Sequence, residues 1–315
     1  MEELQTEKKT EVELSCNGLG VEEALGRPIS QLKKNGDYKG LMVFLQEQLE
    51  KILSAAGETD LLSKLNNELG LAHLELEELE EAATYMDRAV ELDPENINAA
   101  YNRANLSLYH KDLEDALHRY GLILADRENH VGATYNSALC HALSGRVPEA
   151  LPLFKQVVTL EPEYAGAHFW AGECLLDQGK SGEALAYFKG AAELNPGHPE
   201  SIRGLAICLF HSGAYEKAID NCDKLLTQSG PELMALRVKG DCLLAMNNPK
   251  EAAECHIHMA QIDFDAREFV SNRAKFLAQA EPEKAPAYID AVLKHIPEFK
   301  PTLGNLMGAP TAPTS

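Results

Sequence analysis

The chain has 315 residues, of which 29 are lysine or arginine and 49 are aspartate or glutamate, giving a formal net charge of −20. This excess of negative charge opposes binding to the phosphate backbone of nucleic acids and to anionic membrane surfaces. Residues 1–14 lack the basic start and apolar run of a signal peptide, and no apolar stretch reaches the length of a membrane span, so we expect no membrane insertion.

The N-terminal region precedes the regular part of the chain. Residues 1–20 alternate charged and polar side chains without an apolar period, which predicts disorder. Residues 21–62 are predicted to form a degenerate repeat that caps the apolar end of the first full repeat. Its evidence is a turn at Asn35-Gly36-Asp37-Tyr38 followed by the helical apolar spacing of Leu41, Phe44, Leu45, Leu49 and Ile52.

The central region consists of six in-register segments of 34 residues without insertion or deletion. The segments are residues 63–96, 97–130, 131–164, 165–198, 199–232 and 233–266. A fixed period of this length predicts a solenoid of stacked helical pairs with one continuous core. Two capping helices are expected within residues 267–299, and the Pro-, Gly- and Thr-rich residues 300–315 are predicted to form a flexible tail.

Residues at the same place in each segment form columns, and three of these columns predict how the helices pack. The eighth residue is always small: Gly70, Ala104, Ala138, Gly172, Ala206 and Gly240. The twentieth is always alanine, at positions 82, 116, 150, 184, 218 and 252, so two helices should cross there at close range. The twenty-fourth is mostly bulky: Met86, Tyr120, Phe154, Phe188, Cys222 and His256.

These columns, with Pro94, Pro162 and Pro196 where a second helix must end, resemble the tetratricopeptide repeat (TPR). The resemblance covers residues 63–266, about two thirds of the chain. It implies an all-α fold, a right-handed α-solenoid of helix–turn–helix repeats whose first helices line a concave groove. The family's large first-helix aromatic residue is mostly absent, because the fourth column contains Asn66, Ala100, Thr134, His168, Ile202 and Leu236.

Four cysteines indicate the compartment. Cys140, Cys174, Cys208 and Cys242 occupy the tenth place of successive segments. Stacked helical pairs hold such residues about 10 Å apart, beyond the Cα separation of about 7 Å that a disulfide tolerates. We therefore expect reduced core thiols and a cytoplasmic protein.

The fifth column is the first candidate site, since the resemblance places it on the groove. It contains Asn67, Tyr101, Tyr135, Phe169, Arg203 and Arg237. The three aromatic rings can stack on a peptide, and the two arginines can hold an acidic group by paired hydrogen bonds. The alternative is internal: rings packed between adjacent first helices, and arginines paired with acids such as Glu173 or Asp241.

Asparagines form the second candidate site. Asn102 and Asn136 occupy the sixth place of consecutive segments, and Asn105 lies one turn beyond Tyr101. These motifs resemble the asparagine ladder of peptide-binding family members. An amide offers a donor and an acceptor, so it can bind an extended peptide backbone of any sequence. The alternative is local capping of the backbone by these side chains.

Two narrower functional interpretations have less support. Family members that hold the acidic tails of heat-shock chaperones need basic residues among the positions of Asn67, Leu71, Gly132 and Asn136, and none here is basic. The acidic run at residues 75–81 is either a solvated rim or a surface that steers a basic partner.

A metal-dependent activity at Cys255, His256 and His258 is the enzyme-class alternative, although adjacent helical residues point to different faces. No glycine-rich phosphate loop, HExxH or GxSxG motif occurs. We therefore expect no enzyme activity and no cofactor.

The sequence predicts a non-catalytic scaffold or adaptor that binds an extended peptide or a partner helix in its groove. The expected contact residues are Asn67, Tyr101, Asn102, Asn105, Tyr135, Asn136, Phe169, Arg203 and Arg237. The alternatives are a self-assembling solenoid, which would make a homo-oligomer, and a regulatory subunit of a separately encoded enzyme.

Overall fold

A computed structural model describes residues 21–54 and 59–307 of this protein. This part of the chain is all-α, with 17 α-helices, two short 3-10 helices and no strand. The all-α fold class is as the sequence predicts. The residues expected to be disordered, 1–20, lie outside the described part, and so does the end of the expected tail, 308–315.

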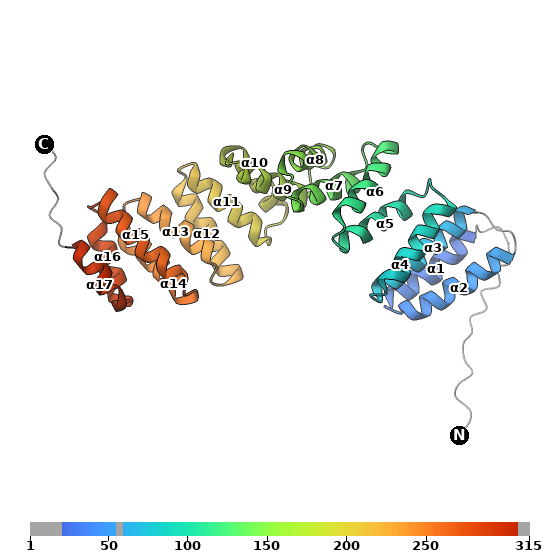
Figure 1. The fold of residues 1–315 in the computed structure, drawn as a ribbon, viewed down its shortest axis with the longest axis horizontal. Helices are drawn as coiled ribbons and strands as arrows, with labels where there is room; N and C mark the ends of the chain where they lie inside the picture. The colour runs from blue at the N-terminus through green and yellow to red at the C-terminus, as the bar shows by residue number, and fades with distance from the viewer. Residues whose placement is uncertain (1–20, 55–58, 308–315) are drawn as a thin grey trace, which may run out of the picture. The chain divides into compact units, whose positions relative to one another are not determined.

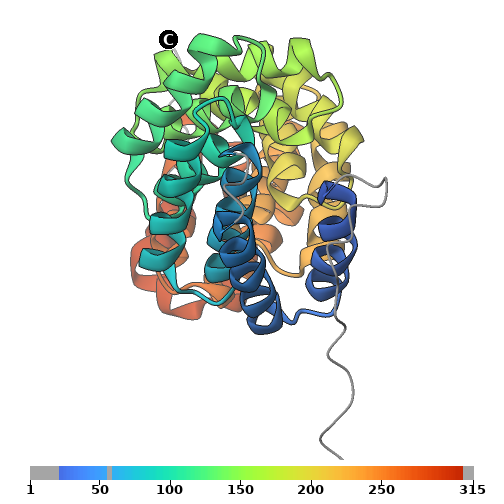
Figure 2. The same cartoon turned by 90° about the vertical axis from the view of Figure 1, so that its right-hand side faces the viewer.

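The chain divides into two compact units, residues 1–140 and 141–315. The first contains α1 (Val21–Lys34), α2 (Tyr38–Ser54), α3 (Thr59–Glu75), α4 (Leu79–Leu92), α5 (Ile97–Tyr109), α6 (Leu113–Asp126) and most of α7 (Val131–Leu143). From α1 to α6 each helix packs against the next, and Figures 1 and 2 both show neighbouring helices running in opposite directions.

The second unit continues the same alternation through further helices. They are α8 (Val147–Leu160), α9 (Ala165–Asp177), α10 (Ser181–Leu194), α11 (Pro199–His211), α12 (Tyr215–Ser229), α13 (Leu233–Ala245), α14 (Pro249–Ile262), α15 (Ala266–Ala280), α16 (Ala285–His295), η1 (Pro297–Phe299), α17 (Lys300–Leu303) and η2 (Gly304–Met307). Helices α5, α7, α9, α11 and α13 begin at the first residue of their segments, whereas α3 begins one turn before Ser63.

In four places the last residue of a segment caps the first helix of the next one, whereas Tyr164 before α9 makes no side-chain cap bond. Asn96 Oδ1 accepts a hydrogen bond from the Ala99 amide at 3.1 Å, and His130 Nδ1 accepts one from Ala133 at 3.0 Å. The His198 and Glu232 side chains accept equivalent bonds. Each cap satisfies an amide that the helix leaves open, which is worth about 1 kcal/mol.

The turn inside each segment also repeats, at the fifteenth residue. This residue has a positive φ in all six segments: Glu77, Lys111, Gly145, Gly179, Gly213 and Asn247, with values from 61° to 77°. Three of them are glycine, which adopts this conformation without strain. A single left-handed residue reverses the chain between the two helices of each pair.

The two helices of a pair cross closely at the small columns, as predicted. All six alanines of the twentieth column are fully buried. A Cβ atom on Gly172 would lie 2.9 Å from Phe188 Cζ, and one on Gly204 of the next segment would lie 2.3 Å from Phe188 Cε1. The buried Phe188 ring therefore fills the space between two consecutive helical pairs.

The prediction of a flexible tail from residue 300 is wrong for residues 300–307. Lys300–Leu303 form α17 and Gly304–Met307 form η2. Leu303 is fully buried in a core cluster that also contains Tyr288 and Val292 of α16. Burial of one leucine offsets the Pro- and Gly-rich composition on which the prediction depended.

We expect Gly204→Ala to lower the free energy of unfolding by about 1–3 kcal/mol, because the new methyl group overlaps the fully buried Phe188 ring. Gly182→Ala in α10 is the matched control, since nothing lies within 4 Å of its Cβ position. Urea unfolding followed by fluorescence of Trp170, the single tryptophan, measures both. Equal stability of the two variants would contradict the close packing at Gly204.

Burial keeps the repeated thiols neutral. Cys140, Cys174, Cys208 and Cys242 are buried. Burial raises the pKa of Cys174 to about 11 and that of Cys208 and Cys242 to about 12. The prediction that these four cysteines lie in the core is confirmed.

These pKa shifts predict a loss of stability at high pH. An unfolded thiol ionises near pH 8.5, whereas the folded thiols resist ionisation up to about pH 11 or 12. Their contribution to stability is complete below about pH 8.5 and is lost as the pH rises through this window. The free energy of unfolding, measured with urea, should therefore decrease less between about pH 8 and 10.5 in the double variant Cys208→Ala/Cys242→Ala than in the wild-type protein. An equal decrease in both proteins would exclude the thiols as its cause.

Candidate functional site

Side-chain hydrogen bonds link the first helices of neighbouring segments in the first unit. Asn102 Nδ2 on α5 donates to Asn67 Oδ1 on α3 at 3.0 Å, and Asn136 Nδ2 on α7 donates to the Tyr101 hydroxyl on α5 at 3.1 Å. In both pairs a sixth-column amide donates to a fifth-column side chain one segment earlier. The structure thus brings four of the predicted contact residues together in one repeating arrangement.

Asn105 extends this network into the core. Its Oδ1 accepts a hydrogen bond from Asn136 Nδ2 at 2.8 Å and one from the Tyr120 hydroxyl at 2.6 Å. Burial raises the pKa of both Tyr101 and Tyr120. The sequence places Tyr120 in the bulky twenty-fourth column but does not predict the hydrogen bond of its hydroxyl group. Spacing along the chain shows which helix face a residue occupies, not which atoms its polar end contacts.

The side-chain carbonyl oxygens of the two sixth-column asparagines accept no hydrogen bond from the described residues. Within residues 21–54 and 59–307, the Oδ1 atoms of Asn102 and Asn136 accept no hydrogen bond, while both Nδ2 groups are engaged. Both side chains are half-buried. Each amide is therefore held in one orientation by its donor bonds, with a carbonyl oxygen available to a ligand.

Fifth-column side chains contact the last residue of their own segment. The Tyr101 ring lies 5.2 Å from the His130 ring, and the Phe169 ring lies 5.0 Å from the His198 ring. Because these last residues cap the following helix, the aromatic rings also support the start of that helix. Part of each half-buried ring is therefore packed against its own segment, as the internal-packing alternative holds.

The two predicted arginines both have acidic partners in the second unit. Arg203 Nη1 lies 3.3 Å from Glu232 Oε1, and its charge also opposes the rise that burial causes in the pKa of Glu173. Arg237 Nε lies 4.0 Å from Asp241 Oδ2, and its guanidinium group lies 5.0 Å from the centre of the Phe269 ring.

The predicted residues divide between the two units. Asn67, Tyr101, Asn102, Asn105, Tyr135 and Asn136 belong to the first, and Phe169, Arg203 and Arg237 belong to the second. Tyr135 is half-buried on α7, and Arg237 is the exposed member of the set.

Helix α1 adds a part of this face that sequence reasoning did not assign. A cavity of about 410 Å³ beside Asn67 is lined by Ile29 and Lys33 of α1 together with Lys64 of α3 and Asn98 of α5. Lys33 Nζ lies 2.5 Å from Glu68 Oε2 of α3. The predicted cap thus also contributes polar side chains next to the paired amides.

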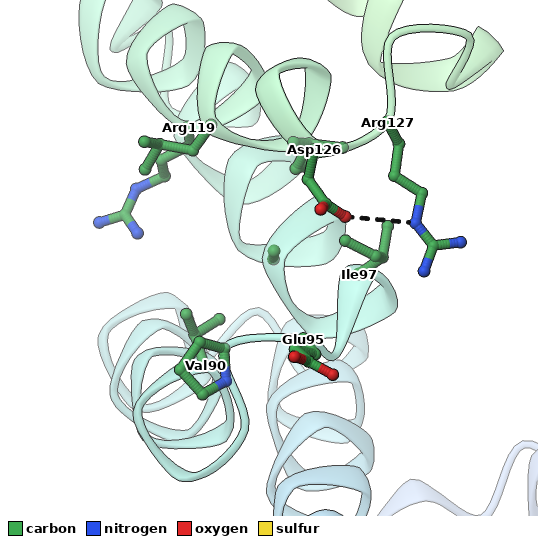
Figure 3. Close-up of a pocket in the computed structure, with 10 residues that line it drawn as sticks. Val90, Glu95, Ile97, Arg119, Asp126 and Arg127 are labelled. Carbon is green, nitrogen blue, oxygen red and sulfur yellow. Dashed lines mark hydrogen bonds and ion pairs between the residues drawn. The ribbon is translucent and has the colours of Figure 1, made fainter.

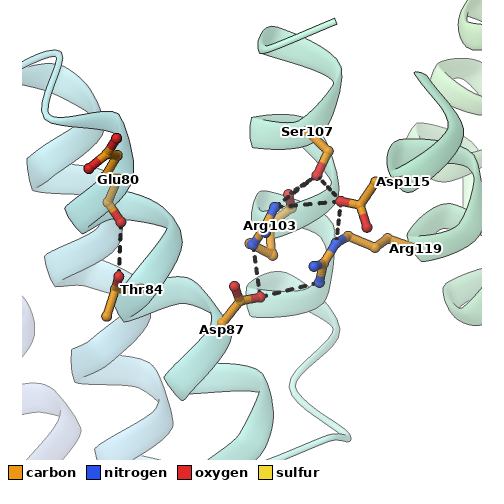
Figure 4. A network of polar contacts seen from close by, with 7 residues as sticks. All are labelled: Glu80, Thr84, Asp87, Arg103, Ser107, Asp115 and Arg119. Carbon is orange, nitrogen blue, oxygen red and sulfur yellow. Dashed lines mark hydrogen bonds and ion pairs between the residues drawn. The ribbon is translucent and has the colours of Figure 1, made fainter. Parts of the chain in front are cut away.

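A charged network links three helices of the first unit (Figure 4). Asp87 of α4 accepts hydrogen bonds from Arg103 Nε at 2.8 Å and from Arg119 Nη1 at 3.3 Å. Arg119 Nε also donates to Asp115 Oδ2 at 2.7 Å. Burial alone would raise the pKa of Asp115, but hydrogen bonds from Ser107 and Arg119 hold it below its usual value. The i,i+4 spacing of Asp115 and Arg119 is the one signal of this network in the sequence.

Comparison with known families identifies the repeat. Models described as tetratricopeptide repeat match residues 63–96, residues 101–160 and 144–199, and residues 175–228, about half of the chain together. The chain belongs to the tetratricopeptide repeat family. A search of curated proteins gave no match.

Solved TPR proteins share the fold. YrrB, a TPR protein described as having an unusual peptide-binding site, is 23% identical, with 58% of this chain and 94% of that chain covered and a TM-score of 0.56. PilF of Pseudomonas aeruginosa is 20% identical over 68% and 99%, with a TM-score of 0.57. A TPR protein from Parabacteroides merdae is 20% identical over 78% and 96%, with a TM-score of 0.54. These identities support similarity of fold alone.

The TPR fold is typically a non-catalytic interaction module. His256, the centre of the metal-site alternative, is fully buried, and its Nδ1 lies 2.9 Å from the Tyr288 hydroxyl. Burial lowers its pKa to about 3, while His258 is exposed. In the described ranges no three His, Cys, Asp or Glu side chains gather as a metal site, and no helix there is long and apolar enough to cross a membrane.

We expect Asn136→Asp to lower the free energy of unfolding of this TPR protein by about 1–3 kcal/mol. The new carboxylate oxygen would face Asn105 Oδ1, and Tyr101 would lose its donor. Asn98→Asp, at an exposed place on α5, introduces the same charge without breaking a bond between first helices and should leave stability unchanged. Urea unfolding followed by circular dichroism compares the two. A stable Asn136→Asp protein would show that the amide bonds do not contribute to the fold.

Proposed function

We propose that this TPR protein is a non-catalytic scaffold or adaptor that binds an extended peptide along the first helices of its repeats. TPR proteins bind protein partners, and the peptide mode is our inference from one observation. The orientations of Asn102 and Asn136 are set by their donor bonds, and both retain a carbonyl acceptor. Such acceptors suit the backbone N–H groups of a peptide of any sequence.

The spacing of these acceptors suits an extended chain. First helices of adjacent segments pack about 10 Å apart, and an extended peptide advances about 3.3 Å per residue. One segment therefore corresponds to about three peptide residues. Backbone N–H groups three residues apart can donate to Asn102 and Asn136 in turn, with the half-buried Tyr101 ring between them as an apolar contact.

Two further observations support the proposal. YrrB, which shares the fold, is described as having an unusual peptide-binding site, and this is an analogy at the level of the fold. The buried thiols Cys174, Cys208 and Cys242 suit a reducing compartment, which supports a cytoplasmic location for this function.

The test uses a peptide selected from a displayed random library on the wild-type protein. Combined alanine substitutions at Tyr101, Tyr135 and Phe169 should abolish its binding, because they remove the apolar contacts. Asn102→Leu should weaken binding about ten-fold, the cost of one missing hydrogen bond to the peptide. Fluorescence anisotropy measures both affinities.

Tyr109→Ala is the matched control, since Tyr109 is a more exposed tyrosine on the same helix as Tyr101. It should bind the peptide as the wild type does. Because Tyr101 and Phe169 also support helix starts, the variants must show wild-type circular dichroism before they are compared. Undiminished binding by the triple variant would exclude the first helices as the site.

A further inference from the structure

A cavity of about 570 Å³ lies between α4 and α6 in the first unit (Figure 3). Its walls are Val90 of α4 and Leu122 and Ile123 of α6, and Ile97 and Ala100 of α5 also line it. Its volume falls within the range of about 300–1,000 Å³ typical of ligand sites. The lining is mainly apolar, with charged side chains at the edges.

The cavity exists because the fourth residue of this segment is alanine. In two other segments the fourth-column residues Ile202 and Leu236 are themselves buried core side chains. Leu236 packs against Leu226 and Met259, which occupy the same columns as Val90 and Ile123. At Ala100 a single methyl group stands where those segments place a branched side chain.

A third segment shows that this place accepts a ring. The fourth-column residue His168 lies with its ring 6.1 Å from that of Tyr187, and a Cβ atom on Gly190 would lie 2.8 Å from His168 Nδ1. Tyr187 and Gly190 occupy the columns of Arg119 and Leu122. The same place between second helices is therefore filled by an aromatic ring in one segment and is open in another.

Charged side chains lie at two edges of the cavity. Arg119 is held by Asp87 and Asp115, the network of Figure 4. At the other edge Arg127 Nε lies 3.4 Å from Asp126 Oδ2 (Figure 3). Guanidinium groups attract the faces of aromatic rings, and a carboxylate accepts a hydrogen bond from an indole N–H.

The occupant that fits this lining is an aromatic side chain of a partner protein, because its ring suits the apolar walls and can stack on a guanidinium group at the edge.

We propose that this cavity is a socket for an aromatic side chain, tryptophan above all, presented by a partner protein. The socket is separate from the proposed peptide site, because Ala100 precedes Tyr101 by one residue and so points about 100° away around α5. The proposal does not depend on peptide binding by the first helices. It gives the chain a second interaction surface, formed by its second helices.

The first experiment uses indole as the probe. In methyl NMR spectra, the Ile97 and Ile123 methyl signals should shift saturably on addition of indole, and cyclohexanol should bind more weakly. Unmoved signals, or equal affinity for cyclohexanol, would overturn the proposal.

A larger side chain at position 100 would fill the socket, and the same change at an exposed position is the matched control. Ala100→Trp should abolish the indole-induced shifts with thermal stability unchanged or increased, whereas Ala125→Trp, at an exposed place on α6, should leave them intact. If Ala100→Trp does not fold, Ala100→Leu reproduces the residue found at position 236. Indole-induced shifts that persist in a folded filled variant would place the binding elsewhere.

Displayed peptides identify the occupant. Peptides selected on the triple variant of Tyr101, Tyr135 and Phe169 should carry an aromatic residue and lose binding to the filled socket. Peptides without aromatic residues would refute the proposal. A light-scattering mass that falls to the monomer value in Ala100→Trp would show that a second copy occupies the socket, which also contradicts a distinct partner.

Discussion

The close crossing of two helices within each segment underlies the rest of this structure. It requires a small eighth residue, an alanine at the twentieth place and a bulky side chain between successive pairs, as Phe188 shows with Gly172 and Gly204. Because this contact recurs every 34 residues, it brings the fifth column of one segment beside the sixth column of the next. The paired amides at Asn67 and Asn102 are a consequence of that register.

Several surface residues serve the fold and the candidate site together. Tyr101 accepts the Asn136 hydrogen bond and packs against His130, which caps α7. A ligand on this face would contact protein side chains that are already ordered, so binding would cost little of their conformational entropy. Half-buried rings meet this condition better than fully exposed ones.

Departures from the repeat account for features that occur in single segments of this protein. Ala100 lies where Ile202 and Leu236 have larger side chains, and it leaves a cavity. The His256 imidazole lies where Phe154 and Phe188 have apolar rings, and its Nδ1 makes a hydrogen bond with the Tyr288 hydroxyl. A repeat fold tolerates such changes because each segment contacts mainly its neighbours, so the cost of one altered contact stays local. Differences of this kind let one repeat architecture present different surfaces.

The sequence alone determined the helical pairs, the close crossing and the buried thiols, because each depends on residue types repeated at a fixed offset. It also indicated which residues share the face that includes Asn102 and Asn136. Only the tertiary structure decided that Tyr120 joins this network, that Arg203 pairs with Glu232, that Leu303 is buried and that Ala100 leaves a socket. Those outcomes depend on how far side chains reach across helices and on the volume left between them, and neither quantity repeats with the sequence period.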